Sequence, residues 1–198
     1  MMLTEKEKRE LEQQARNKKV LAISLAASAG TMLLAALIWY AIFSSQFAVF
    51  TEDVHHIKIK YPSNWSVAKG YEGTVVAFVS PKEHELDGLQ ENLNIAITDL
   101  SLKPMTLQEY TDLAIKQMEA VFDRNIQVVE SKPISIVGQQ GYKYVVRGPP
   151  PLELVITFIL FIKDNEAYTI TYMGQTIQYE KFRAKFDEMV RSFSILTP

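Results

Sequence analysis

The 198-residue chain contains no cysteine and only three histidines. The lack of cysteine excludes disulfide bonds, thiolate metal centres and a thiol nucleophile. Neither charge is in strong excess, with 21 basic and 23 acidic residues, so the composition does not indicate a nucleic-acid-binding surface. The P-loop, GxSxG and HExxH motifs are also missing. We therefore expect neither an enzymatic activity nor a cofactor.

The most prominent feature that is present is an uninterrupted apolar stretch, which begins at Val20 and ends at Phe43 and contains no charged residue. About 20 apolar residues in a helix span the hydrocarbon core of a bilayer. The stretch therefore predicts a single transmembrane helix, a signal anchor in contact with the lipid bilayer. The small residues Ala22, Ala26 and Gly30 recur every four positions, a spacing that would allow a weak homodimer through close helix packing.

The charges on the two sides of this stretch predict its orientation. Arg16, Lys18 and Lys19 precede it, whereas the first charged residue after it is Glu52. Positive charge is retained on the cytoplasmic side of a membrane helix. We therefore expect residues 1–19 to form a charged cytoplasmic arm, with the C-terminal domain outside, in the periplasm, at the cell surface or in a lumen.

A cleaved signal peptide is the alternative to an anchor, with the small residues at 27–29 as the cleavage site. The apolar stretch continues well beyond that point and is longer than the apolar core of a signal peptide, so we favour the anchor. Residues 44–54 are then a short tether, and residues 55–198 form one extracytoplasmic domain held close to the membrane.

Within this domain the hydrophobic pattern alternates between the strand and helix periods. Strands are predicted over residues 55–61, 65–67, 73–80, 92–100, 126–137, 142–147, 152–162 and 167–173, with turns at 138–141 and 164–165. The strand at 152–162 is apolar on both alternations, which is typical of a central strand covered on both faces. Helices are predicted over 106–122 and 176–191. The expected fold is α+β, an antiparallel sheet with helices packed on it.

The first of these helices begins with a capping box, Thr106 followed by Glu109. Apolar side chains then recur at helical spacing and predict a face packed against the core. They are Leu107, Tyr110, Leu113, Ala114, Met118 and Val121.

The succession of segments resembles that of PsbP-like proteins. The matching segments are YPSNW at 61–65, AFVSP at 77–81, NLNIAI at 92–97, TLQEY at 106–110, GQQGYKYV at 138–145, AYTITY at 167–172 and RSFSI at 191–195. The resemblance implies an α/β/α sandwich, shared with a nuclear Ran-binding protein and with bacterial lipoproteins and membrane-anchored proteins. It further implies a non-enzymatic binding or accessory domain, here in a membrane-anchored bacterial member. None of the family's interaction residues can be transferred to individual positions.

The only weak metal-ligand candidates are histidines close to carboxylates: His55, and the loop group Glu83, His84, Glu85 and Asp87. Imidazole with carboxylates suits zinc or manganese. We favour solvated loop charge as the interpretation of the same residues, so we assign no metal site. We expect the domain to fold without metal, as a monomer.

Two functions from different classes remain. The first is an accessory module of the cell envelope, which presents a sheet edge or groove to an unidentified membrane or envelope protein. The second is a domain that binds a lipid or another small apolar ligand between the sheet and a helix. A core filled by Phe158, Phe161, Tyr168 and Phe182 favours the first, and an apolar cavity of several hundred Å³ favours the second.

Overall fold

The computed structural model describes residues 19, 21, 30–40, 46–70, 73–83, 89–122, 126–150 and 153–197. The chain divides into two units, Met1–Gln46 and Phe47–Pro198. In the first unit, residues 30–40 are helical. Among the described residues, no helix has both the length and the apolar character needed to cross a membrane. Half of the predicted anchor, including Ala22 and Ala26, lies outside the described residues, so the anchor and its packing face stay predictions.

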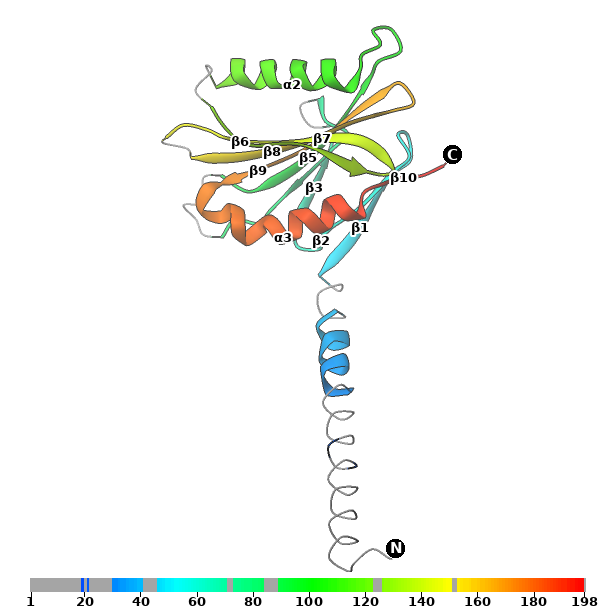
Figure 1. The fold of residues 1–198 in the computed structure, drawn as a ribbon, viewed down its shortest axis with the longest axis vertical. Helices are drawn as coiled ribbons and strands as arrows, with labels where there is room; N and C mark the ends of the chain where they lie inside the picture. The colour runs from blue at the N-terminus through cyan, green and yellow to red at the C-terminus, as the bar shows by residue number, and fades with distance from the viewer. Residues whose placement is uncertain are drawn as a thin grey trace, which may run out of the picture. The chain divides into compact units, whose positions relative to one another are not determined.

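The second unit is built on an antiparallel sheet of seven strands in the order β3-β4-β5-β9-β8-β7-β6 (Figure 1). The strands are β3 Ser66–Lys69, β4 Val76–Val79, β5 Asn92–Asp99, β6 Gln127–Ile136, β7 Gln139–Arg147, β8 Leu154–Lys163 and β9 Glu166–Gln175. Strands that follow one another along the chain pair directly, except where helix α2, Leu107–Val121, connects β5 to the far edge at β6. The chain then returns strand by strand until β9 pairs with β5. The predicted antiparallel α+β fold is confirmed.

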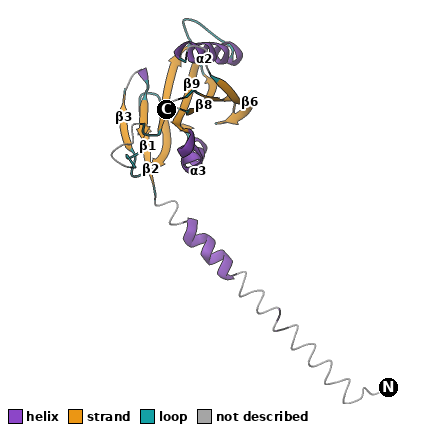
Figure 2. Cartoon of the chain, turned by 90° about the vertical axis from the view of Figure 1, so that its left-hand side faces the viewer, coloured by secondary structure: helices purple, strands orange, loops and turns teal. Residues whose placement is uncertain are grey.

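A smaller sheet has the order β1-β2-β10 and consists of β1 Phe47–Glu52, β2 Ile57–Pro62 and β10 Ser194–Ile195. The second long helix, α3, spans Thr176–Ser192. Helix α2 covers one face of the main sheet and α3 covers the other (Figure 2). The helix, sheet and helix layers are those of the α/β/α sandwich that the resemblance implied.

The first strand lies inside the segment that the sequence pattern assigned to a tether. Strand β1 pairs with β2 along its whole length, and Phe50 stands opposite Ile59. Phe50 is buried, and its ring meets the ring of Phe78 edge-on, with 5.5 Å between centroids. The folded unit therefore begins at Phe47, several residues earlier than the predicted boundary. Phenylalanines next to an apolar stretch also suit a membrane interface, which is why the pattern alone did not reveal this strand.

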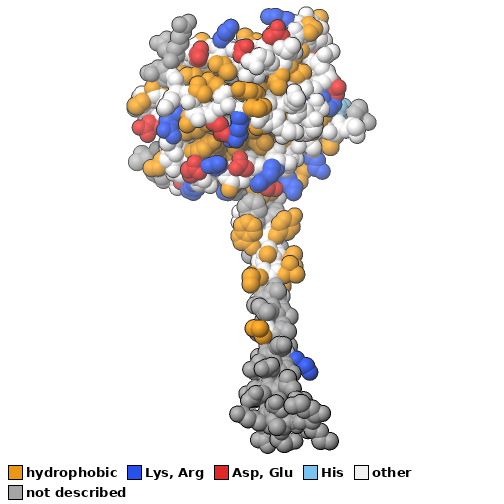
Figure 3. Space-filling view, in the orientation of Figure 1, with side chains coloured by type: hydrophobic (Ala, Val, Ile, Leu, Met, Phe, Trp, Pro, Cys, Tyr) orange, Lys and Arg blue, Asp and Glu red, His pale blue; other side chains and the backbone are white. Residues whose placement is uncertain are grey.

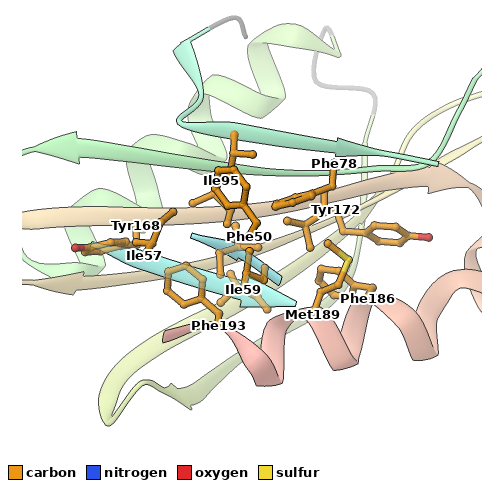
Figure 4. Packing of buried hydrophobic residues seen from close by; sticks show 14 of the residues in the cluster. Phe50, Ile57, Ile59, Phe78, Ile95, Tyr168, Tyr172, Phe186, Met189 and Phe193 are labelled. Carbon is orange, nitrogen blue, oxygen red and sulfur yellow. The ribbon is translucent and has the colours of Figure 1, made fainter. Parts of the chain in front are cut away.

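The larger core lies between the main sheet, the small sheet and α3 (Figure 4). Phe186 and Met189 of α3 are buried, and Phe186 stacks on Tyr172 of β9 with 4.6 Å between ring centroids. On the same face, Phe161 stacks on Tyr168 at 4.7 Å. Each buried side chain of this size contributes about 1.5–3 kcal/mol through removal of apolar surface from water. The contact between Phe186 and Tyr172 holds α3 on the main sheet, and Ile57 and Ile59 of the small sheet are buried in the same core.

Strand β8 contributes side chains to two hydrophobic cores, one on each face of the main sheet. Ile156 and Phe158 face α2, whereas Ile159 and Phe161 face α3. All but the last two residues of the strand are buried. The prediction of a central strand covered on both faces is confirmed, since β8 lies between β9 and β7 in the sheet.

The hairpin between β6 and β7 is tighter than predicted. Its turn consists of Val137 and Gly138, both with positive φ, 51° and 72°, so that β7 already begins at Gln139. Two positive φ values match the twist of the flanking strands in a two-residue hairpin turn. The predicted turn at Asp164 and Asn165 is of the same kind, with φ values of 53° and 61°.

Candidate functional site

A groove with a volume of about 310 Å³ runs between α2 and the β5, β9 and β8 part of the main sheet. We call it the α2 groove; it is lined by Ala96, Thr98, Tyr110, Leu113, Ala114, Gln117, Met118, Val121, Phe158 and Thr169. Leu113 and Val121 are 38% and 74% exposed, so the apolar lining opens to solvent along the helix. No carboxylate, imidazole or amine is among the lining side chains. The α2 groove is therefore suited to binding apolar groups.

The position of α2 follows from its cap and its inner face. The Thr106 hydroxyl accepts a hydrogen bond from the Glu109 N–H at 3.2 Å, and the Thr106 N–H donates to the Glu109 carboxylate at 2.8 Å. The Glu109 carboxylate accepts hydrogen bonds from both the backbone N–H and the hydroxyl of Thr106, and these lower the pKa of Glu109. The predicted capping box and helix start are confirmed. The predicted core face is wrong in part, because Leu113 and Val121 remain exposed at the groove.

Three hydroxyl groups make one part of the groove polar. The Tyr110 hydroxyl on α2 lies 3.0 Å from Oγ1 of Thr169 on β9 and 3.5 Å from Oγ1 of Thr98 on β5. Hydroxyls can donate and accept hydrogen bonds. The polar part of an occupant could therefore be oriented here while its apolar part contacts Met118 and Phe158. Sequence periodicity gave no sign of these hydroxyls, because they come from three elements that only the fold brings together.

The predicted metal candidates are not brought together within the described residues. Nδ1 of His55 lies 2.9 Å from a carboxylate oxygen of Glu52, which also accepts the His55 backbone N–H at 2.7 Å. Partial burial acts to raise the pKa of Glu52, but the hydrogen bonds from His55 and Val54 outweigh it and lower the pKa. The carboxylate of Glu83 contacts Lys181 of α3. Across the described part of the chain, no three His, Cys, Asp or Glu side chains are grouped as metal ligands would be.

Three of the loop candidates, His84, Glu85 and Asp87, lie outside the described residues. Their contribution to a metal site stays a prediction.

On the α3 face, polar side chains are buried in the core. The hydroxyls of Thr157 and Tyr179 lie 3.1 Å apart, and Ser80 donates to the carboxylate of Glu91 at 3.1 Å. The hydroxyl of Tyr172 is buried without a hydrogen-bond partner among the described residues. Burial raises the pKa of Tyr172, so its phenol is uncharged at neutral pH. We interpret these groups as structural, since Thr157 and Tyr172 are completely buried.

The four aromatic residues predicted to fill the core do so. Phe161, Tyr168 and Phe182 are buried between the main sheet and α3. Phe158 is buried on the opposite face, where it also forms part of the α2 groove. The hollow between the main sheet and α2 is thus a surface groove of about 310 Å³ beside a filled core.

The layered fold defines the class of protein to which the chain belongs. The domain is similar to cyanobacterial PsbP, CyanoP, from Synechocystis sp. PCC 6803, with a TM-score of 0.59 and 17% identity over 76% of this chain and 93% of the other. It is similar to LpqN of Mycobacterium tuberculosis, described as involved in cell envelope biogenesis (TM-score 0.56, 6% identity, 76% and 92% covered). It is also similar to the Ran-binding protein Mog1p of Saccharomyces cerevisiae (TM-score 0.54, 13% identity, 75% and 95% covered). These likenesses establish a fold shared by PsbP and Mog1.

The sequence assigns the chain more narrowly. The PsbP family model matches residues 45–195, which is most of the chain, and the protein belongs to the PsbP family. A comparison with curated protein sequences found no match. The predicted family is confirmed.

Proposed function

We propose that this protein is a non-enzymatic accessory module of the cell envelope, which binds a membrane or envelope protein through the α2 groove. Support comes from one observation above all: the apolar lining is open at the surface, with Leu113 and Val121 exposed beside a filled core. Exposed apolar side chains around a concave surface favour docking of a partner's side chains. The description of Mog1p as Ran-binding is consistent with a protein partner for this fold.

The proposal includes an N-terminal membrane anchor over residues 20–43, with the domain on the extracytoplasmic side. It is supported by the uncharged stretch and by the basic residues that precede it. The anchor would hold the domain, which begins at Phe47, within a few residues of the bilayer. A partner embedded in or attached to the same membrane would then meet the domain at high effective concentration.

Site-specific photo-crosslinking of the full-length protein in its own cells tests the docking surface. A photoreactive amino acid replaces Val121 at the α2 groove, or Val67, which is 37% exposed on the edge strand β3 and does not line the groove. We expect a discrete adduct with another protein from position 121 and none from position 67. Equal labelling from both positions, or no protein adduct at position 121, would contradict the proposal.

A second function is favoured by the size and lining of the same groove. Its volume of about 310 Å³ lies at the lower end of the range for small-ligand sites, and its lining is mainly apolar with three hydroxyls. A lipid or other apolar molecule would therefore also fit. If native mass spectrometry of the full-length protein reveals a stoichiometric apolar small molecule, and position 121 crosslinks to no protein, this second function replaces the first.

A further inference from the structure

A second groove, with a volume of about 290 Å³, lies between α3 and strands β6, β7 and β8. We call it the α3 groove, and it is on the opposite face of the main sheet from the α2 groove. Its floor is apolar, because Val145 and Val155 are buried. Val129, at the β-bulge in β6, lines one side of the groove and is half exposed.

Charged side chains surround this apolar floor. Lys143 and Arg147 come from β7 and Arg183 from α3, while Glu130 and Glu180 provide two carboxylates. Hydrophobic side chains lie among acidic and basic ones on the face of the domain in Figure 3. The lining thus carries three cations against two anions, a small positive excess over an apolar surface.

Both carboxylates already have cationic partners. Glu130 lies 2.9 Å from Lys143 and 2.5 Å from Lys132, and Glu180 lies 3.3 Å from Arg183. Hydrogen bonds from Lys132 and Lys143 lower the pKa of Glu130, so the carboxylate is ionised at neutral pH. Neither carboxylate is therefore left to neutralise a further cation.

Arg147 is the lining cation that lacks a partner. Its side chain is exposed, and within the described parts of the chain it makes no ion pair or hydrogen bond. A guanidinium presents a planar fork of donors that matches the two oxygens of a carboxylate. Arg147 stands opposite Val155 in the ladder between β7 and β8. A ligand whose carboxylate pairs with Arg147 would therefore place its neighbouring groups over Val145 and Val155.

We propose that the α3 groove binds a segment of a partner protein that carries one carboxylate next to an apolar side chain. The carboxylate pairs with Arg147, and the apolar side chain packs on Val145 and Val155. A run of several carboxylates is disfavoured, because Glu130 and Glu180 line the same groove. This inference rests on the proposed function only in taking the ligand to be a protein, and it uses a separate surface.

Selection of displayed peptides tests the proposal. Random seven-residue peptides are selected in detergent on the full-length protein carrying Leu113→Asp, which places a charge in the α2 groove. Those retained are measured against variants by fluorescence anisotropy. We expect retained peptides to contain one Asp or Glu within two positions of a large aliphatic or aromatic residue. Arg147→Ala should weaken their binding at least about tenfold, and Arg147→Lys should weaken it less, because charge is kept without the fork.

The matched control is Arg191→Ala, which removes an exposed arginine of α3 that does not line the groove. It should leave peptide binding unchanged, as should Leu113→Asp on the other face of the sheet. Peptides without an acidic residue, no retained peptide, or equal binding to Arg147→Ala would each overturn the proposal. Because Leu113→Asp affects only the α2 groove, failure of this inference is distinguishable from failure of the proposed function.

Discussion

Two buried tyrosines of β9 show how different the surroundings of one residue type can be within a single core. The Tyr168 hydroxyl donates to the Glu166 carboxylate at 2.6 Å, whereas the Tyr172 hydroxyl has no partner among the described residues. Burial raises the pKa of both phenols, with the hydrogen bond to Glu166 adding to the effect at Tyr168. A buried polar group without a partner costs about 1–3 kcal/mol in desolvation. The hydroxyl of Tyr172 therefore lowers the stability of the core, whereas the packing of its ring raises it.

Removing the Tyr172 hydroxyl and removing the Tyr168 hydroxyl should change the free energy of unfolding in opposite directions. We expect Tyr172→Phe to raise the free energy of unfolding by up to about 1 kcal/mol, because an unpaired hydroxyl is lost without any change in ring packing. Tyr168→Phe should lower it by about 1 kcal/mol, because it breaks a hydrogen bond to a carboxylate. Urea denaturation of the two variants measures both. A marked loss of stability in Tyr172→Phe would show that its hydroxyl has a partner in solution.

Glu130 should make stability depend on pH. Hydrogen bonds from Lys132 and Lys143 lower its pKa below the ordinary value of 4.5. A lowered pKa in the folded state adds stability above pH 4.5, and this contribution is lost as the pH falls through the folded-state pKa. Glu130→Gln should therefore be slightly less stable than the wild type at pH 7, and the two should converge in acid. The difference in free energy of unfolding should stay below about 1 kcal/mol, because Glu130 and its lysine partners are partly exposed. If the plots of stability against pH for the two proteins remained parallel below pH 4.5, this prediction would be wrong.

At the scale of elements, β1 decides where the folded domain begins. It pairs with β2, and its Phe50 enters the larger core together with Ile57 and Ile59. Val49, on the other face of the same strand, is 53% exposed. A segment that served only as a tether would have no such difference between neighbouring side chains.

Neighbouring substitutions in β1 test its place in the fold. Phe50→Ala should lower the free energy of unfolding by about 3–5 kcal/mol, since it leaves a cavity in the core. Val49→Ala should change it by less than about 0.5 kcal/mol, as is usual at exposed positions. Thermal denaturation followed by circular dichroism distinguishes them, and equal effects of the two substitutions would argue that β1 does not pack on the domain.

Helix α2 depends on its capping box in a similar way. Thr106→Ala removes the hydroxyl that accepts the Glu109 N–H and should lower the free energy of unfolding by about 1 kcal/mol. Thr106→Ser keeps the acceptor and should be close to wild type. If Thr106→Ser were as unstable as Thr106→Ala, the methyl group and not the cap would be responsible.

At the scale of the whole molecule, the sequence pattern predicted the succession of strands and helices from β2 to α3, the doubly covered β8 and the family. Those features leave local signals, such as Thr106 with Glu109, or an apolar run bounded by turns. It did not predict that Leu113 and Val121 would be exposed, because periodicity tells which side of a helix faces the sheet and not how far the sheet extends beneath it. The charged α3 groove was missed for a related reason: Arg147 and Arg183 are far apart in sequence and line the same groove only once α3 has packed on the main sheet.

The central claim is that the α2 groove docks a protein partner. The most direct test places a photoreactive residue at position 121 in two matched variant backgrounds and compares the yield of the protein adduct. One background carries Leu113→Asp, which places a charge in the groove, and the other carries Leu102→Asp at a leucine that is 99% exposed and does not line it. We predict that the adduct falls at least about tenfold with Leu113→Asp and is unchanged with Leu102→Asp. An adduct of equal yield in both backgrounds would contradict the account.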